Sequence, residues 1–317
     1  MFFEYFCPCR MIDRLRHSGI CVRLFAIVSL GISFLPSGFA EEQKPAATQQ
    51  EEPSPDPAAL MVRADDLLKD QSNPGNTQMA VLFLAQAAAA GHAEAANRLG
   101  YLYDMGKGVA ADDVKALEWF QKAADAGLPK AKFNLGRFLI LGLGGASDAD
   151  KGIWYLEAAA NEGVVPAQVA LAKMFFFGES GQNIDYKRAF PYALLAAEAG
   201  DAEGQNMVGV MRNFGWGVNR DKSEAAKWFS KAAEQGHAKA QASYADALLN
   251  GTGVKMDKVE AIKFYTLSAN QGEVTGKNPL EDLSAGIDPA ILAEGTLRAQ
   301  QFSAQKRNEE ISKKQGE

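Results

Sequence analysis

A repeat of about 36 residues is the feature that most constrains the fold of this chain. An aromatic residue is followed eight positions later by glycine five times in succession, and the aromatic residue recurs at steps of 36, 37, 36 and 36 residues. The pairs are Trp119/Gly127, Tyr155/Gly163, Tyr192/Gly200, Trp228/Gly236 and Phe264/Gly272, with a degenerate copy, Phe83/Gly91, 36 residues before the first. Repeats of this period are typical of solenoids, in which each unit stacks on its neighbours.

Each repeat has the pattern of two helices. Alanine and leucine recur with a spacing near 3.6 residues and almost no strand-like alternation, which predicts helices. We expect a helix A, a glycine-containing turn, a helix B and a glycine stop in each unit. The turn glycines include Gly106, Gly108, Gly215, Gly217, Gly251 and Gly253, and the expected N-caps of helix B are Asp112, Asp148, Asp185, Asp221 and Asp257. The sequence therefore predicts an all-α fold, an α/α solenoid, because one helix pair cannot bury its own apolar face.

The aromatic–glycine pairs and the turn glycines together make up the structural signature of the repeat. The glycine of each pair suits the position after a helix, where the backbone has a positive φ. Small residues elsewhere in the unit should let the helices approach closely where they cross. We therefore assign the whole signature to the scaffold.

The repeats divide the chain into segments. Residues 58–91 are expected to form an N-terminal capping helix pair, residues 92–276 five repeats, and residues 277–317 a C-terminal capping helix with a frayed tail. Asp288-Pro289 is a suitable start for that last helix. Pro191 lies in the second turn of the third helix B and predicts a kink, or a late helix start near Phe190, as the main irregularity.

The first 57 residues differ from the repeats. Four arginines precede the apolar run 24–35, and small residues end at Ala40, which is the pattern of a secretory signal peptide over residues 1–40. We expect cleavage after Ala40 and a periplasmic or secreted protein without stable membrane insertion. An uncleaved leader that anchors the protein to the membrane is the alternative, and Met11 is an alternative start. Residues 41–57, rich in proline and glutamate, are expected to be a disordered tether.

Charge and cysteine content exclude several functions. The leader carries four arginines against Glu4 and Asp13, a net charge of +2, so the chain changes from −6 to −8 when it is removed. All three cysteines lie within the leader. The mature protein would then have no disulfide and no cysteine nucleophile or ligand. An acidic chain without a basic block is also a poor nucleic-acid binder.

Motifs that would suggest a catalytic or ligand-binding site are not repeated when the units are aligned, so they do not indicate such a site. Lys107 lies between turn glycines as in a phosphate-binding loop, but the other four copies have no lysine there. Asp113, beside the capping Asp112, is not repeated either. His92 and His237 occupy the same place four repeats apart, so they cannot share a metal, and we interpret them as surface residues or residues near a helix C-terminus. We therefore predict no catalytic residue, no metal and no cofactor.

The candidate functional surface is the inner wall of the solenoid. In helix-pair solenoids, helix A lines the concave side, so positions two residues before and two residues after the central leucine of helix A are candidates for a partner-binding groove. Asparagine, charged and aromatic side chains at such positions suit an extended or helical peptide. The candidates are Asn97, Tyr101, Phe133, Arg137, Lys173, Phe176, Asn206, Asn213 and Asp246, with Val169, Val210, Ala242 and Asn250 at related positions.

Two stretches carry a resemblance to a known family. "LGYLYDMGKGVAADDVKALEWFQKAADAG" (residues 99–127) and the stretch 208–240 resemble Sel1-like repeats, which are related to tetratricopeptide repeats. The resemblance covers residues 78–276 and implies an interaction scaffold, with many bacterial members exported. It suggests a monomer that binds another protein or peptide and modulates an envelope regulatory or secretion process. A cell-envelope hydrolase or glycan-binding protein on the same scaffold is the alternative.

Overall fold

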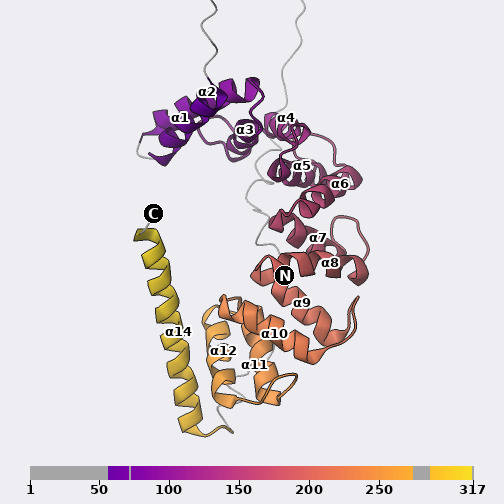
Figure 1. Ribbon diagram of the computed structural model, residues 1–317, viewed down its shortest axis with the longest axis vertical. Coiled ribbons are helices and arrows are strands. Elements are labelled where there is room, and N and C mark those ends of the chain that lie inside the picture. Colours follow the sequence, from indigo (N-terminus) through magenta and orange to yellow (C-terminus); the bar gives the residue numbers. More distant parts are fainter. Residues whose placement is uncertain (1–55, 71–72, 274–285, 316–317) are drawn as a thin grey trace, which may run out of the picture. The chain divides into compact units, whose positions relative to one another are not determined.

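The computed structural model describes residues 56–70, 73–273 and 286–315, and this part of the chain forms thirteen helices and no strand. Figure 1 shows the helices following one another in chain order. The all-α solenoid that the repeat predicts is confirmed. The helices are α1 (Pro57–Lys69), α2 (Pro74–Ala89), α3 (Ala93–Met105), α4 (Asp113–Asp125), α5 (Pro129–Leu141), α6 (Ala149–Asn161), α7 (Val165–Phe177), α8 (Tyr186–Glu198), α9 (Ala202–Phe214), α10 (Lys222–Glu234), α11 (Ala238–Asn250), α12 (Lys258–Asn270) and α14 (Pro289–Gln315).

Five helix pairs repeat with the same geometry. The A helices are α3, α5, α7, α9 and α11, the B helices are α4, α6, α8, α10 and α12, and all ten have 13 residues. Each helix packs on the next one in the chain, both within a unit and between units. We number the units one to five in chain order, from α3–α4 to α11–α12.

The turn between helices A and B has the chemistry that the sequence predicts. The carboxylate of every predicted aspartate cap accepts a hydrogen bond from the backbone N–H three residues later, at 2.9–3.1 Å. Every A helix ends at a glycine with left-handed backbone angles. The backbone N–H of the capping aspartate donates to the helix A residue two positions before the last, as from Asp221 to Arg212 at 2.8 Å. This turn is therefore fixed at both ends.

The glycines that end the B helices act only within their own unit. They are Gly127, Gly163, Gly200, Gly236 and Gly272, and each has a positive φ between 75° and 96°. The backbone N–H of the residue after each of them donates to the carbonyl five positions earlier, at 2.9–3.3 Å, which is the Schellman arrangement that ends a helix. The predicted glycine stops are thus confirmed.

These five glycines differ from the turn glycines in their surroundings. Gly127, Gly163, Gly200 and Gly272 are exposed and Gly236 is half-exposed, and nothing lies within 4 Å of the place where a Cβ would stand on any of them. They make no close contact that a Cβ would prevent. Their one requirement is the left-handed backbone, which glycine adopts without a steric cost.

The second turn glycine, in contrast, has a role between units. Gly217 has a φ of +70°, and a Cβ atom on it would overlap the carbonyl group of Tyr186, the first residue of the previous helix B. Gly253 meets Lys222 in the same way, and Gly108 and Gly144 approach the backbone of Thr77 and Asp113. Each of these turns contacts the preceding helices through a glycine, because only a residue without a Cβ allows so close an approach.

The turn of unit three is the irregular one. It contains one extra residue, and Ser180 has a φ of +56°, the one positive value among the non-glycine residues described. Nothing lies within 4 Å of the place where a Cβ would stand on Gly181, so this turn lacks the close contact of the other four. The helix that follows begins at Tyr186 and is capped by Asp185. The predicted late start near Phe190 is therefore wrong, since the cap starts the helix five residues before Pro191, and the kink given as the other possibility stays a prediction.

The core is a series of clusters shared between neighbouring units. The repeat aromatics are buried or half-buried in these clusters: Trp119, Tyr155, Tyr192, Trp228 and Phe264. Alanine pairs near the end of the first four B helices are almost fully buried, as in Ala159-Ala160. Small residues let the helices approach closely, so large side chains from the next unit can fill the remaining space.

Hydrogen bonds of glutamine side chains also join the units. Three buried glutamines at equivalent places donate to backbone carbonyls near the end of the previous B helix: Gln168 to Ala160, Gln205 to Ala197 and Gln241 to Ala233, at 3.0–3.3 Å. Each of these carbonyls also accepts the backbone N–H of the glycine that ends the helix, at 3.0–3.1 Å, so the glutamine amide adds a second hydrogen bond there. The side chains of Gln235 and Gln271 then donate to Gln205 and Gln241 at 2.8 and 2.9 Å.

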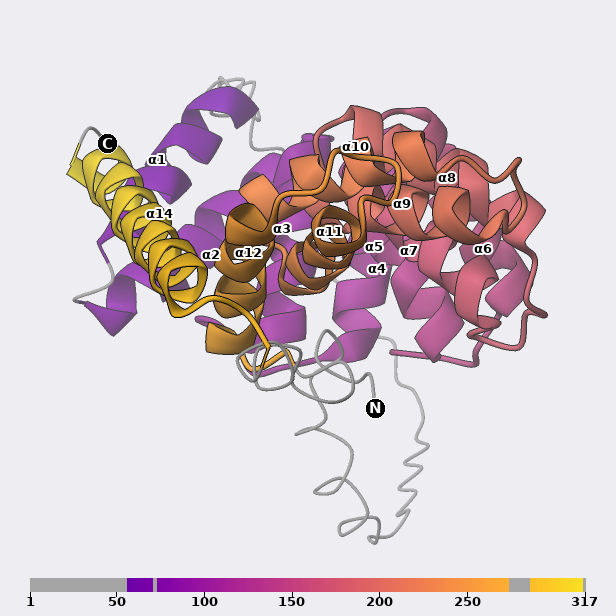
Figure 2. The same cartoon turned by 90° about the horizontal axis from the view of Figure 1, so that it is seen from below.

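The two ends of the solenoid are helical as well. Helices α1 and α2 pack together with Leu60, Leu84 and Leu99 in one cluster. At the other end, α14 lies alongside α12 (Figure 2), where Ala299 is buried and Phe302 packs against the last cluster. The leader, most of the tether and residues 274–285 lie outside the described residues. Among the helices that are described, none is both long and apolar enough to cross a membrane.

Candidate functional site

The predicted groove residues share one face of the A helices. The fifth, ninth and thirteenth residues of a helix are four positions apart and therefore lie on the same side. We call these fifteen residues the A-helix face. They are Asn97, Tyr101 and Met105; Phe133, Arg137 and Leu141; Val169, Lys173 and Phe177; Asn206, Val210 and Phe214; and Ala242, Asp246 and Asn250. Phe176 and Asn213 are the twelfth residues of their helices, beside this face.

The fifth positions are largely covered by neighbouring units. Asn97 and Asn206 are only 9% and 7% exposed. The amide of Asn134 donates to Asn97 Oδ1 at 2.9 Å, so this candidate links units one and two. Buried side chains of this kind support the A-helix face, and the contact of these two asparagines with a partner stays a prediction.

The ninth positions are more accessible and differ in their contacts. Tyr101 is 48% exposed. The guanidinium of Arg137 lies over the ring of Phe133, 5.7 Å from its centroid. The carboxylate of Asp246 accepts a hydrogen bond from the hydroxyl of Tyr265, and burial together with this carboxylate raises the pKa of Tyr265. Along the solenoid, the ninth positions of the A-helix face therefore change from aromatic and cationic residues to an acidic residue.

Lys173 belongs to an ionic chain across three units. Its Nζ lies 3.1 Å from Glu203 Oε1, and Glu203 Oε2 lies 2.8 Å from His237 Nε2. His237 Nδ1 accepts the N–H of Ala240, so Nε2 carries the proton that is donated to Glu203. Burial alone would raise the pKa of Glu203, but the hydrogen bond from His237 and the charge of Lys173 outweigh it and lower that pKa to about 2.

The same geometry corrects the interpretation of the two histidines. His92 and His237 are the N-caps of α3 and α11, and their Nδ1 atoms accept the N–H of Ala95 and Ala240 at 3.3 and 3.2 Å. They therefore act at the start of the following helix and not at the end of the preceding one. The sequence did not indicate this because histidine is not among the preferred capping residues.

Replacing Glu203 with glutamine should lower the free energy of unfolding at pH 7 by about 1.5–3 kcal/mol, the range for a hydrogen bond to a charged group. The folded-state pKa lies below the ordinary 4.5, so the stabilisation is present above pH 4.5 and is lost as the pH falls towards 2. Urea unfolding between pH 2 and pH 7 measures this. Glu118→Gln, an exposed change on α4, is the control, and an equal effect of both variants at pH 7 would contradict the prediction.

The thirteenth positions form an exposed apolar row. Met105, Leu141, Phe177 and Phe214 are the last residues of four consecutive A helices and are 44%, 41%, 48% and 55% exposed. A repeated exposed apolar position exceeds the scattered apolar residues of an ordinary surface and indicates a binding site. Asn250 ends the row in unit five.

Aromatic rings from two units gather around this row. Trp216, in the turn of unit four, stacks on Tyr186 at 5.1 Å and on Phe214 at 4.8 Å. Phe176 contacts Phe177, Tyr186 and Trp216 with centroid distances of 4.8–5.7 Å. We call these five residues the aromatic cluster. Phe176 was among the candidate residues predicted from the sequence, whereas Trp216 was not. An aromatic residue between two turn glycines, found in this unit alone, was the available signal.

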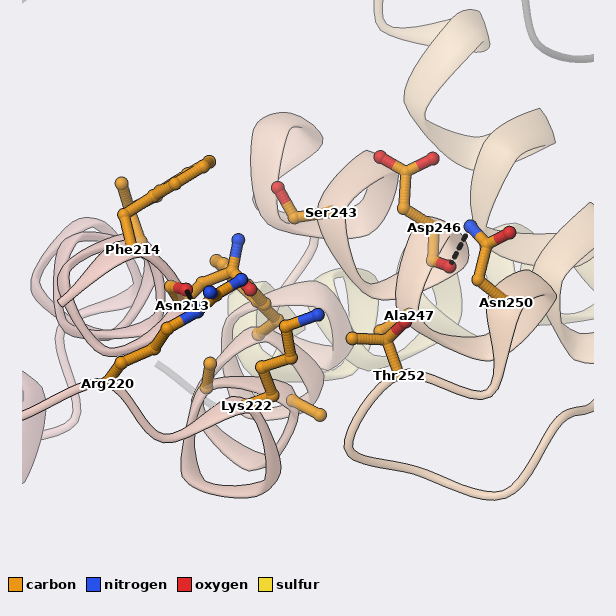
Figure 3. A pocket seen from close by; sticks show the side chains of 13 residues that line it. Asn213, Phe214, Arg220, Lys222, Ser243, Asp246, Ala247, Asn250 and Thr252 are labelled. Carbon is orange, nitrogen blue, oxygen red and sulfur yellow. Dashed lines mark hydrogen bonds between the residues drawn. The ribbon is translucent and has the colours of Figure 1, made fainter.

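A pocket adjoins the aromatic cluster. It lies between α9, α10 and α11, has a volume of about 310 Å³, and has Phe214 on one side (Figure 3). Its polar lining includes Asn213, Arg220, Lys222, Asp246 and Asn250, and its floor includes Ala225 and Phe229. The structure thus brings together the predicted residues Asn213 and Asp246. Arg220 and Lys222 were not predicted, because they belong to the loop and the first residue of helix B. In the described part of the chain, no group of histidine, cysteine and acidic side chains is arranged to hold a metal.

The fold and this surface define a helical-repeat scaffold whose A helices carry exposed apolar and aromatic side chains. The Sel1 repeat family model matches residues 72–92, 93–128, 129–164, 165–201, 202–237 and 238–273. The chain therefore belongs to the Sel1 repeat family. Sel1 repeats generally mediate protein–protein interactions and are generally non-catalytic scaffolds.

Solved structures show the same fold. A Sel1 repeat protein from Oxalobacter formigenes is 30% identical with a TM-score of 0.60, and the match covers 77% of this chain and 99% of that one. A protective antigen of uropathogenic Escherichia coli strains, which displays an SLR fold, is 23% identical with a TM-score of 0.52, covering 78% of this chain and 61% of that one. No curated protein matches the sequence.

Proposed function

We propose that this protein is an exported scaffold that binds another protein along the A-helix face, in a concave groove. The observation that carries the proposal is the exposed row of Met105, Leu141, Phe177 and Phe214, which repeats in four consecutive units. A partner that covers this row would remove a large apolar surface from water, at about 25 cal/mol for each Å² buried. An extended or helical segment matches a row whose members recur once per unit.

The ionic and aromatic contacts along the wall support the same use. Lys173, Glu203 and His237 hold three units together beside the row, and the aromatic cluster joins units three and four. Such contacts keep the wall in one arrangement before a partner arrives, which lowers the cost of ordering on binding. Export rests on the leader, and a mature protein that begins at Glu41 in the periplasmic fraction tests it.

Site-specific photocrosslinking in the native host tests the binding face. A benzophenone amino acid at Tyr101 or Phe177 should crosslink one and the same partner protein, because both positions are exposed on the A-helix face. The matched control is Trp154, which is 62% exposed on a B helix. A partner captured equally well from Trp154, or no crosslink from either A-helix position, would contradict the proposal. In a second arm, Phe177→Glu should lower the yield of the partner captured from Tyr101.

A further inference from the structure

We propose that the pocket between units four and five binds the carboxylate of an acidic side chain in an extended segment of the partner. This inference rests on the proposed function, because it specifies which residue of a bound segment the protein selects. The pocket's two cations, the placement of its one acidic residue, and the aromatic rings at its edge carry the inference.

Two cations face the pocket without a carboxylate partner. Arg220 Nε donates to the backbone oxygen of Asn213 at 2.9 Å, which fixes the guanidinium against the end of α9. Lys222 is the first residue of α10, and Figure 3 shows that its amine and the guanidinium of Arg220 reach towards the middle of the pocket. Among the described residues, no ion pair joins either side chain to an acid, whereas Lys132, Lys173 and Arg188 each pair with a glutamate within or across units. A guanidinium and an ammonium group together suit a carboxylate.

The acidic residue of the pocket does not neutralise these cations. Asp246 is engaged by the hydroxyl of Tyr265, and Figure 3 shows its carboxylate turned away from the amine of Lys222. The side-chain amide of Asn250 donates to the backbone oxygen of Asp246 at 2.9 Å. The pocket therefore keeps a net positive charge, whereas the chain as a whole has a net charge of −6. Charge complementarity at this place favours an acidic ligand.

The surroundings identify the ligand as a peptide segment with an apolar residue near its acid. Phe214 lines the pocket and also stacks on Trp216 of the aromatic cluster, so the apolar row and the charged pocket are continuous. Asn213 also lines the pocket, and its side-chain amide can bond a peptide backbone. A segment that carries a phenylalanine or leucine a few residues from a glutamate or aspartate fits both parts at once.

Binding of synthetic peptides to the purified protein tests this inference. The probes are fluorescein-labelled octapeptides of serine and alanine with one phenylalanine and one glutamate, placed two, three or four residues apart. Matched peptides have glutamine or lysine in place of glutamate. At least one glutamate peptide should bind about tenfold more tightly than its glutamine match in fluorescence anisotropy, and the preference should weaken in high salt.

Two variants at equivalent positions locate the effect. Lys222→Glu should lower the affinity for the glutamate peptide about tenfold or more and favour the lysine peptide, because it reverses a charge in the pocket. An acid in the first turn of a helix is favoured by the helix dipole, so this variant should fold. Lys258→Glu changes the first residue of α12, which does not line the pocket, and should leave the affinity unchanged.

Equal binding of the glutamate and glutamine peptides, or an equal loss in both variants, would overturn the acidic preference and leave a peptide-binding scaffold. The absence of binding by any peptide at millimolar concentration would overturn the inference as well. The proposed function is judged separately by the crosslinks from Tyr101 and Phe177, which do not depend on the pocket.

Discussion

Alanine in place of Gly217 is expected to lower the free energy of unfolding by about 2–5 kcal/mol. Two costs add. A residue with a Cβ loses about 1–2 kcal/mol in left-handed backbone, and forcing atoms into a packed contact costs about 1–3 kcal/mol. Gly217 has a φ of +70°, and its Cβ would overlap the carbonyl group of Tyr186, so the turn of unit four would have to move away from unit three. Urea unfolding followed by circular dichroism measures the loss.

Gly181 offers a matched control for the two costs. It has a φ of +78° in the turn of unit three, but nothing lies within 4 Å of the place where its Cβ would stand. Gly181→Ala should therefore lose only the backbone term, about 1–2 kcal/mol. If Gly181→Ala and Gly217→Ala destabilise the protein equally, the contact between turn and preceding helix does not hold the units together. Because repeat units unfold in part independently, hydrogen exchange of the Gly217 variant should show the larger loss in α8 and α9.

Alanine in place of Phe138 is expected to destabilise the protein by about 3–5 kcal/mol, the range for removing a buried phenylalanine. The ring of Phe138 is 1% exposed and lies edge-on to the ring of Phe120, with 5.0 Å between centroids. Both belong to the cluster that joins units one and two, so the cavity would open at that junction. Hydrogen exchange resolved by peptide should show loss of protection in α4 and α5 before α10 and α11.

Trp154 provides the comparison for Phe138. It is also a large aromatic residue, but its side chain is 62% exposed and its ring contacts that of its neighbour Tyr155. Trp154→Ala should change the free energy of unfolding by less than about 0.5 kcal/mol, as for ordinary surface substitutions. A loss for Phe138→Ala as small as this would mean that the cluster between units one and two contributes little to the solenoid.

Local chemistry made the helices of this chain predictable. An aspartate cap, a glycine that accepts positive φ and a 3.6-residue apolar spacing act over a few residues, so they can be recognised within one repeat. For this reason the caps at Asp112, Asp148, Asp185, Asp221 and Asp257 were placed correctly. The late start of α8 was wrong because the effect of Pro191 was weighed above that of the cap at Asp185.

The glycines of the signature show which features could not be predicted from neighbouring residues in the sequence. Gly127 and Gly217 both have positive φ, and in the sequence they differ only in their place within the unit. In the structure Gly127 has open space where a Cβ would stand, whereas Gly217 touches the backbone of the preceding unit. The conformation of each glycine was predictable from its own neighbours, but its contact required the position of the next unit.

The surface also depended on contacts between units, which the pattern of one unit does not contain. Residues on one face of the same helix have different exposures: Asn97 is buried beside Asn134, whereas Tyr101, four residues later, is half exposed. Trp216 meets Tyr186 of the previous unit, and Lys222 meets a pocket wall supplied by the next one. These neighbours are about thirty residues apart in the sequence, and only the stacking of units brings them together.

The sequence by itself thus determined the repeat, the helices and their ends, because those depend on residues within a few positions of each other. The tertiary structure decided which side chains remain exposed, which rings gather around Trp216 and which cations face the pocket beside Phe214. The physical reason is that burial and charge pairing depend on the unit that stacks above or below, and each unit carries different side chains on the same backbone.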